Sequence, residues 1–152
     1  MKKNTIVDLI SSFFIFLFLY TGISKLLKYE DFKYALYKSP LLKQVYPVVA
    51  AVIPPLEIII ASMLLIPFFS DSPRLRKWGL YSSAILMLLF TIYVGYMVEF
   101  RTNRPCTCGG IIQLMNWHQH MYFNAVSTLL AFLAIWLNNK QTKENFKKAV
   151  LA

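Results

Sequence analysis

Four long apolar runs constrain this chain more than any other feature of its sequence. They cover about residues 6–27, 45–69, 78–100 and 121–137. About 20 apolar residues in an α-helix cross the roughly 30 Å hydrocarbon core of a bilayer. Only 15% of the residues are charged, against about 25% in ordinary soluble domains. The sequence therefore predicts an all-α integral membrane protein, a four-helix bundle that forms a single transmembrane domain over residues 1–152.

The first run follows a basic start, Met1-Lys2-Lys3, of the kind that also begins a signal peptide. Its apolar stretch is longer than the core of a signal peptide, and no clear small-residue cleavage site follows it. We therefore expect residues 6–27 to be retained as a membrane span.

A segment rich in lysine and tyrosine, residues 29–43 (YEDFKYALYKSPLLK), follows the first span. Its aromatic residues and its leucines give it an amphipathic character, and such segments tend to lie in the headgroup layer of a membrane. An ordinary loop helix packed on the bundle is the alternative. Both interpretations predict a short amphipathic element after the first helix.

The second run carries a proline pair, Pro54 and Pro55, and the only acid deep inside any apolar run, Glu57. Glu57 lies about 12 residues into its span, which is about 18 Å along a helix. Acids inside a membrane are costly and face a partner or a cavity. Glu57 therefore predicts a proton relay or a hydrogen bond to a quinone headgroup, or else a structural bond.

The structural alternative for Glu57 has several candidate partners on the first span, namely Tyr20, Ser24 and Lys25. Lys25 is expected nearer the outer surface than Glu57. Direct pairing between these two residues then needs a bent helix or a lysine side chain that snorkels along the apolar surface.

Both cysteines of the chain fall between the third and fourth runs, in residues 104–110 (RPCTCGG). A disulfide between Cys106 and Cys108 closes a tight ring, and strained, exposed disulfides are the exchange-active kind. A structural disulfide gains more stability by joining distant segments. The pair therefore predicts redox exchange, with metal binding and two incidental thiols as the alternatives.

Two histidines, His118 and His120, follow the cysteines and complete a possible Cys2His2 zinc set. Residues two apart on a helix point to nearly opposite sides, so both histidines could bind one ion only in an extended segment. We therefore predict no metal site. A single histidine near the thiols, His120, is the simpler assignment, because it can hold a thiolate or relay its proton.

The basic residues predict the orientation in the membrane. Those at the two termini and in residues 70–77 number nine, and those in the other two loops number seven. The positive-inside rule then places both termini in the cytoplasm and the cysteine loop, residues 101–120, outside it, where disulfides persist. The net charge of +9 therefore reflects topology signals that flank apolar runs, and we expect no nucleic-acid partner.

The chain resembles the DoxX-like superfamily, in the branch related to the methylamine utilisation protein MauE. The resemblance covers roughly residues 6–137. It is carried, in this order, by residues 20–26 (YTGISKL), residues 54–57 (PPLE), residues 106–110 (CTCGG), Trp117, His120 and Asn124.

The resemblance implies a four-helix bundle in the bacterial cytoplasmic membrane. It also implies a role beside a thioredoxin-like partner, forming or transferring disulfides in exported proteins with quinone as electron acceptor. Cys106 and Cys108 are then the redox pair, with Lys25, Glu57 and His120 as the matching polar positions. Better-known quinone-linked disulfide generators have two cysteine pairs and this chain has one, so either a partner supplies the second pair or the relay is incomplete here.

We therefore predict that Cys106 and Cys108 cycle between dithiol and disulfide in a component of a thiol–disulfide oxidoreductase. His120 assists proton transfer, while Glu57, Lys25 and Tyr20 are candidates for a polar or quinone site. The alternative hypothesis is a structural or accessory subunit of a larger membrane complex, whose Cys106–Cys108 disulfide forms once and stays closed.

Overall fold

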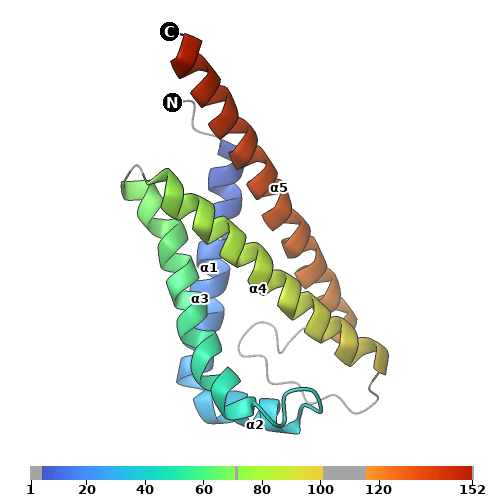
Figure 1. The fold of residues 1–152 in the computed structure, drawn as a ribbon. Coiled ribbons are helices and arrows are strands. Elements are labelled where there is room, and N and C mark those ends of the chain that lie inside the picture. The colour runs from blue at the N-terminus through green and yellow to red at the C-terminus, as the bar shows by residue number, and fades with distance from the viewer. Residues whose placement is uncertain (1–4, 71, 101–115, 152) are drawn as a thin grey trace.

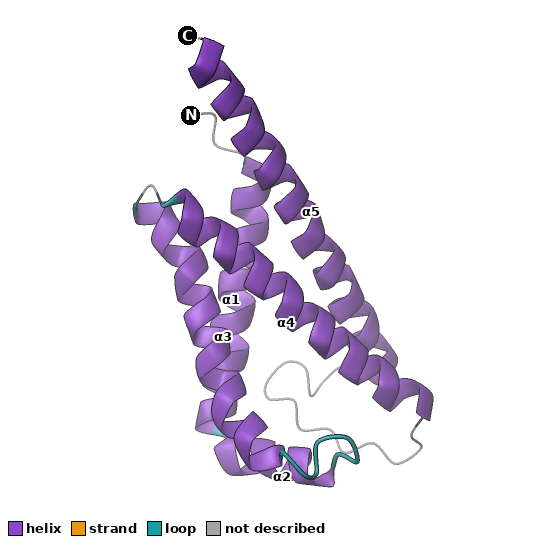
Figure 2. Cartoon of the chain, viewed as in Figure 1, coloured by secondary structure: helices purple, strands orange, loops and turns teal. Residues whose placement is uncertain are grey.

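The computed structural model describes residues 5–70, 72–100 and 116–151. Within these ranges the chain forms five α-helices and no strand. Figure 2 colours the helices purple and the connecting loops teal. Their bounds are Thr5–Leu27 (α1), Tyr29–Lys38 (α2), Tyr46–Phe69 (α3), Pro73–Phe100 (α4) and Trp117–Leu151 (α5). The prediction of an all-α chain is confirmed.

Four of these helices are long and apolar enough to cross a membrane. The candidate spans are Thr5–Leu27, Tyr46–Phe69, Pro73–Glu99 and His118–Glu144. Each has at least 23 residues, and about 20 are sufficient. The predicted integral membrane four-helix bundle is therefore confirmed, and a lipid bilayer is its environment.

The four long helices pack as a closed ring of neighbours. α1 contacts α3 and α5, and α4 contacts the same two helices from the other side. The start of α1 and the end of α5 lie at one end of the bundle, and α2 lies at the opposite end (Figure 1). We call these the termini end and the α2 end.

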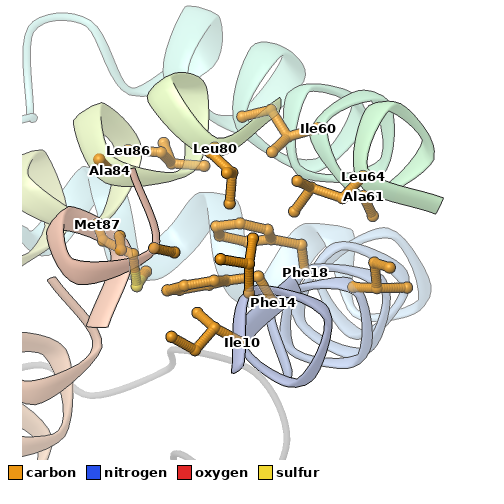
Figure 3. Close-up of a cluster of buried hydrophobic side chains, with 14 residues drawn as sticks. Ile10, Phe14, Phe18, Ile60, Ala61, Leu64, Leu80, Ala84, Leu86 and Met87 are labelled. Carbon is orange, nitrogen blue, oxygen red and sulfur yellow. The ribbon is translucent and has the colours of Figure 1, made fainter. Parts of the chain in front are cut away.

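The core fills the bundle between its middle and the termini end. Phe14 and Phe18 of α1 are fully buried, with ring centroids 5.7 Å apart and nearly parallel planes. Leu64 of α3 and Leu80 of α4 close over these rings, as Figure 3 shows. In a bilayer, where lipid is as apolar as these side chains, such burial stabilises the bundle through van der Waals packing, so this region is its close-packed apolar core.

The amphipathic segment after the first span is the helix α2. Phe32 and Leu36 on one face are buried against Ala50 of α3, while Tyr34 and Tyr37 on the other faces are exposed. This packing agrees with the loop-helix alternative. Its position in the headgroup layer stays a prediction.

Two helices extend beyond the apolar runs. α4 begins at Pro73, five residues before the run at Trp78, and proline is favoured at a first helical position because its missing N–H has no partner there. α5 continues through the basic tail to Leu151. Much of the expected linker and tail is therefore helical.

Candidate functional site

An ion pair between α1 and α3 is the centre of the candidate site. The Lys25 ammonium donates to Oε1 of Glu57. The Lys25 side chain is 9% exposed and the Glu57 side chain is fully buried. Removing one partner from a buried pair leaves an uncompensated charge, so each of these two residues is stable in the bundle only while the other is present.

Close approach of the two helices brings the pair together. A Cβ placed on Gly22 would lie 3.1 Å from the carbonyl oxygen of Pro54 and 3.4 Å from the Cβ of Glu57. Only glycine allows the backbones to approach this closely without displacement. Gly22 therefore sets the register of α1 against α3 one turn from Lys25.

Lys25 and Glu57 were expected at different depths in the membrane, and the direction of their side chains removes this difference. Side chains on a helix lean toward its N-terminus. On antiparallel α1 and α3, Lys25 therefore leans toward the middle of the bundle and Glu57 leans toward the α2 end. The direct pair, for which the sequence required a bend or snorkelling, forms because the two side chains lean toward each other.

Aromatic rings surround the lysine. The Nζ of Lys25 lies 5.7 Å from the ring centroid of Phe32 on α2 and 5.2 Å from that of Phe90 on α4. Cations within about 6 Å of a ring centroid are attracted by its negative face. Side chains of four helices, α1 to α4, therefore meet at this ammonium.

The second oxygen of the Glu57 carboxylate has a different environment. Oε2 is buried and accepts no hydrogen bond within the described ranges. The Thr21 hydroxyl, which lines the same cavity, donates its hydrogen to the carbonyl oxygen of Leu17. Oε2 is therefore a buried acceptor with unused capacity.

A second polar pair lies on α5. Nδ2 of Asn124 is 3.3 Å from Nε2 of His120, one helical turn away. Both residues are more than nine-tenths buried, and Nδ1 of His120 has no hydrogen-bond partner among the described residues. His118 is exposed. Residues 117–120 are helical, so the two histidines face different sides.

The ion pair and the histidine pair line one cavity of about 380 Å³. This volume falls within the about 300–1,000 Å³ usual for small-molecule sites. All five helices contribute to its wall, which is mostly apolar. Its polar side chains are those of Thr21, Lys25, Glu57, Tyr93, His120 and Asn124.

The structure brings together three of the predicted site residues, Lys25, Glu57 and His120. Tyr20 lies on α1 with its side chain 41% exposed, and it is not part of the cavity wall. Cys106 and Cys108 lie outside the described residues. Within the described ranges, no three histidine, cysteine or acidic side chains form a group that could hold a metal ion.

Sequence reasoning missed three contributors to this site. Phe32 was named only as part of the amphipathic segment, Phe90 was not singled out, and Asn124 entered only through the family resemblance. Each is separated from the ion pair by a loop or a whole span, and only the packing brings them to it. The spacing of His120 and Asn124, four residues apart on a helix, is the one signal that could have indicated their pairing.

The bundle and its cavity define a multi-pass membrane protein with a charged, largely apolar internal site. The family model of methylamine utilisation protein MauE matches residues 3–137 of the chain. The chain belongs to this family. No curated protein and no solved structure matches it significantly. Membership of the wider DoxX-like superfamily stays a prediction.

Proposed function

We propose that this protein is a membrane thiol–disulfide redox component. Cys106 and Cys108 exchange with a thioredoxin-like partner during extracytoplasmic disulfide formation or electron transfer, and quinone serves as the electron acceptor. One observation carries the proposal: Lys25, Glu57, His120 and Asn124 converge on an apolar cavity at the α2 end. Membership of the MauE family supports a membrane role of this accessory kind.

The place of the cysteines in the chain supports their link to the cavity. They lie between Phe100, where α4 ends, and Trp117, where α5 begins. Both helices line the cavity close to these ends, α4 through Tyr93 and α5 through His120. The redox pair therefore lies in the segment that connects two helices of the proposed acceptor site.

The exchange conserves electrons and protons. A thiolate of the partner attacks one sulfur of the Cys106–Cys108 disulfide, a mixed disulfide forms, and the other cysteine leaves as a thiolate. The partner's second thiol then attacks the mixed disulfide. The partner is left oxidised and the pair holds two electrons and two protons. The two protons that the pair gains come from the two thiols of the partner, and His120 assists their transfer.

The residues of the cavity fit a quinone as the group that reoxidises the pair. Two buried polar atoms, Nδ1 of His120 and Oε2 of Glu57, have unused hydrogen-bonding capacity beside an apolar wall. A bound quinone takes up two electrons and two protons, the amount released when one dithiol becomes a disulfide. Lys25 and Glu57 provide the polar end of the site, and Phe90 the apolar side.

We place the protein in the bacterial inner membrane, with both termini in the cytoplasm and residues 101–120 outside it. The even number of spans supports a common side for the termini, since α1 begins and α5 ends at the same end of the bundle (Figure 1). The thioredoxin-like partner then meets the cysteines on the extracytoplasmic side. Other membrane subunits are further candidate partners, and one of them can supply the second cysteine pair.

The redox state of Cys106 and Cys108 in intact membranes tests this function. The chain has two cysteines, so single Cys106→Ser and Cys108→Ser variants assign every labelled thiol. A membrane-impermeant alkylating reagent is applied before and after titration with a thiol–disulfide buffer. We expect a pair that opens and closes reversibly and is labelled from outside.

Two results would contradict this proposal in different ways. A pair that stays closed under the buffer favours the accessory subunit with a static disulfide. Labelling only after the membrane is opened reverses the orientation. The rate of exchange adds a test of His120, since loss of a proton-transfer group slows a reaction about 10²-fold. We expect His120→Ala to show this loss and the exposed control His118→Ala to react at the normal rate.

A further inference from the structure

Asn124 determines which nitrogen of His120 carries the proton. The amide nitrogen Nδ2 of Asn124 lies 3.3 Å from Nε2 of His120. With the Asn124 amide assigned in this orientation, Nδ2 donates and Nε2 accepts, so a neutral ring carries its hydrogen on Nδ1. Nδ1 is buried without a hydrogen-bond partner among the described residues. The cavity wall therefore contains an unused N–H donor at His120.

Lys25 supplies a second donor to the same cavity. Its ammonium has three hydrogens, and one is donated to Oε1 of Glu57. The rings of Phe32 and Phe90 and the bond to Glu57 restrict the position of this ammonium. An ordered donor in an apolar site selects for a ligand with a matching acceptor, because an unpaired buried polar group costs free energy.

These groups define the chemistry of the ligand. Two donors, from α1 and α5, lie in a wall that is otherwise mostly apolar. We propose that the cavity binds quinones through their carbonyl oxygens, which accept hydrogen bonds from Nδ1–H of His120 and from Lys25. Asn124 is the positioning residue that presents this His120 donor. Oε2 of Glu57 is the acceptor for a hydroxyl of the reduced form.

The rim of the cavity favours a ligand that arrives from the lipid. Leu89 and Ile92 of α4 line the cavity, and they are 57% and 59% exposed on the surface of a candidate span. A surface of this kind faces hydrocarbon. An apolar molecule with carbonyl oxygens therefore reaches the site without crossing water.

This binding mode rests on the proposed function, because it assigns atoms to the acceptor of that function. The test is therefore made on the full chain carrying Cys106→Ser and Cys108→Ser, in detergent. Quinones add to thiols, and this background removes that reaction. Binding can then fail while cysteine exchange in the native chain succeeds, or the reverse, so the two failures are distinguished.

The probes are 2-methyl-1,4-naphthoquinone and 2-methylnaphthalene, which lacks the two oxygens. Their dissociation constants are measured by equilibrium dialysis, with empty micelles as the blank. We expect the quinone to bind, and His120→Ala and His120→Phe to weaken it about three- to tenfold, the effect of one neutral hydrogen bond. The control variant His118→Ala and the oxygen-free probe should show no such difference.

Three results overturn the proposal. They are no saturable binding of the quinone, equal affinity in both His120 variants that fold, and equal affinity of the two probes for the unmodified site. His120→Phe keeps a ring in place of the imidazole. Weaker binding in this variant therefore cannot be attributed to the lost side-chain volume of His120→Ala.

The role of Asn124 has its own spectroscopic signature. With His118→Ala, the chain keeps one histidine, and its ¹⁵N chemical shifts report which ring nitrogen is protonated. We expect Nδ1 to carry the hydrogen, and Asn124→Leu to convert this state into a mixture of both tautomers. A purely structural Asn124 would leave the tautomer unchanged, and a hydrogen on Nε2 in the parent chain would overturn the assignment.

Discussion

Among the residues that the structure describes, two ion pairs join α1 to neighbouring helices, and their surroundings differ. Asp8 pairs with Arg76 of α4 near the termini end, with both side chains about one-quarter exposed. Lys25 pairs with Glu57 of α3 toward the α2 end, where both side chains are almost or fully buried. The first pair is partly accessible from outside the bundle, whereas the second is enclosed within it.

The surroundings explain the difference. Between the two pairs lies the apolar core around Phe14 and Phe18 (Figure 3), and Phe18 also lines the cavity. Beyond that core the packing leaves about 380 Å³ open next to Lys25 and Glu57. A charge pair near a helix end can serve to orient the helices in the membrane and to stabilise their packing, and it requires no ligand. A buried pair beside an open cavity indicates a site for a ligand.

Breaking the buried pair should have the largest effect. Glu57→Leu leaves the Lys25 charge unpaired, and loss of one partner of a buried pair costs about 3–5 kcal/mol in the free energy of unfolding. The double variant Lys25→Met with Glu57→Leu removes both charges and should recover most of that loss. Chemical unfolding in detergent micelles measures both. If Glu57→Leu alone unfolds like the parent chain, the pair does not stabilise α1 against α3.

The close approach beside the pair should show the next largest effect. Gly22→Ala forces a Cβ to within 3.1 Å of Pro54 and Ile58, and overpacking costs about 1–3 kcal/mol. Gly95→Ala is the matched control, because nothing lies within 4 Å of its added Cβ. It should be neutral or stabilise α4 by up to about 1 kcal/mol through helix propensity. Equal stability of the two variants would remove Gly22 as the point of contact.

The pair at the termini end should show the smallest effect. Asp8→Asn and Arg76→Gln should each change the free energy of unfolding by about 0–1 kcal/mol, as for solvent-accessible ion pairs. The change should shrink further with added salt, which screens such charges. A loss as large as that of Glu57→Leu in the same micelles would abolish the distinction between the two pairs.

Much of the fold was predictable from local sequence. The four apolar runs predicted four spans, and the tyrosine- and lysine-rich segment predicted a short amphipathic element, which is α2. Glu57 was predictable as a site residue because a charge deep in an apolar run requires a partner or a cavity. Its partner was not predictable. Tyr20, Ser24 and Lys25 lie close together along α1, and the rotation of α1 about its own axis decides which of them points toward Glu57.

The sequence by itself determined that this chain is helical, that it crosses a membrane, and which positions carry polar groups inside it. The length of an apolar run, which is compared with the thickness of the bilayer, is a local property of the sequence. The chemistry of each side chain is local as well, so both are visible in the sequence itself. Only the tertiary structure decided that Lys25 meets Glu57, that Phe32 and Phe90 enclose the lysine, and that His120 and Asn124 face the same cavity. These contacts depend on the register and rotation of helices far apart in sequence. In an apolar chain, faces directed to lipid and faces directed to protein have the same composition.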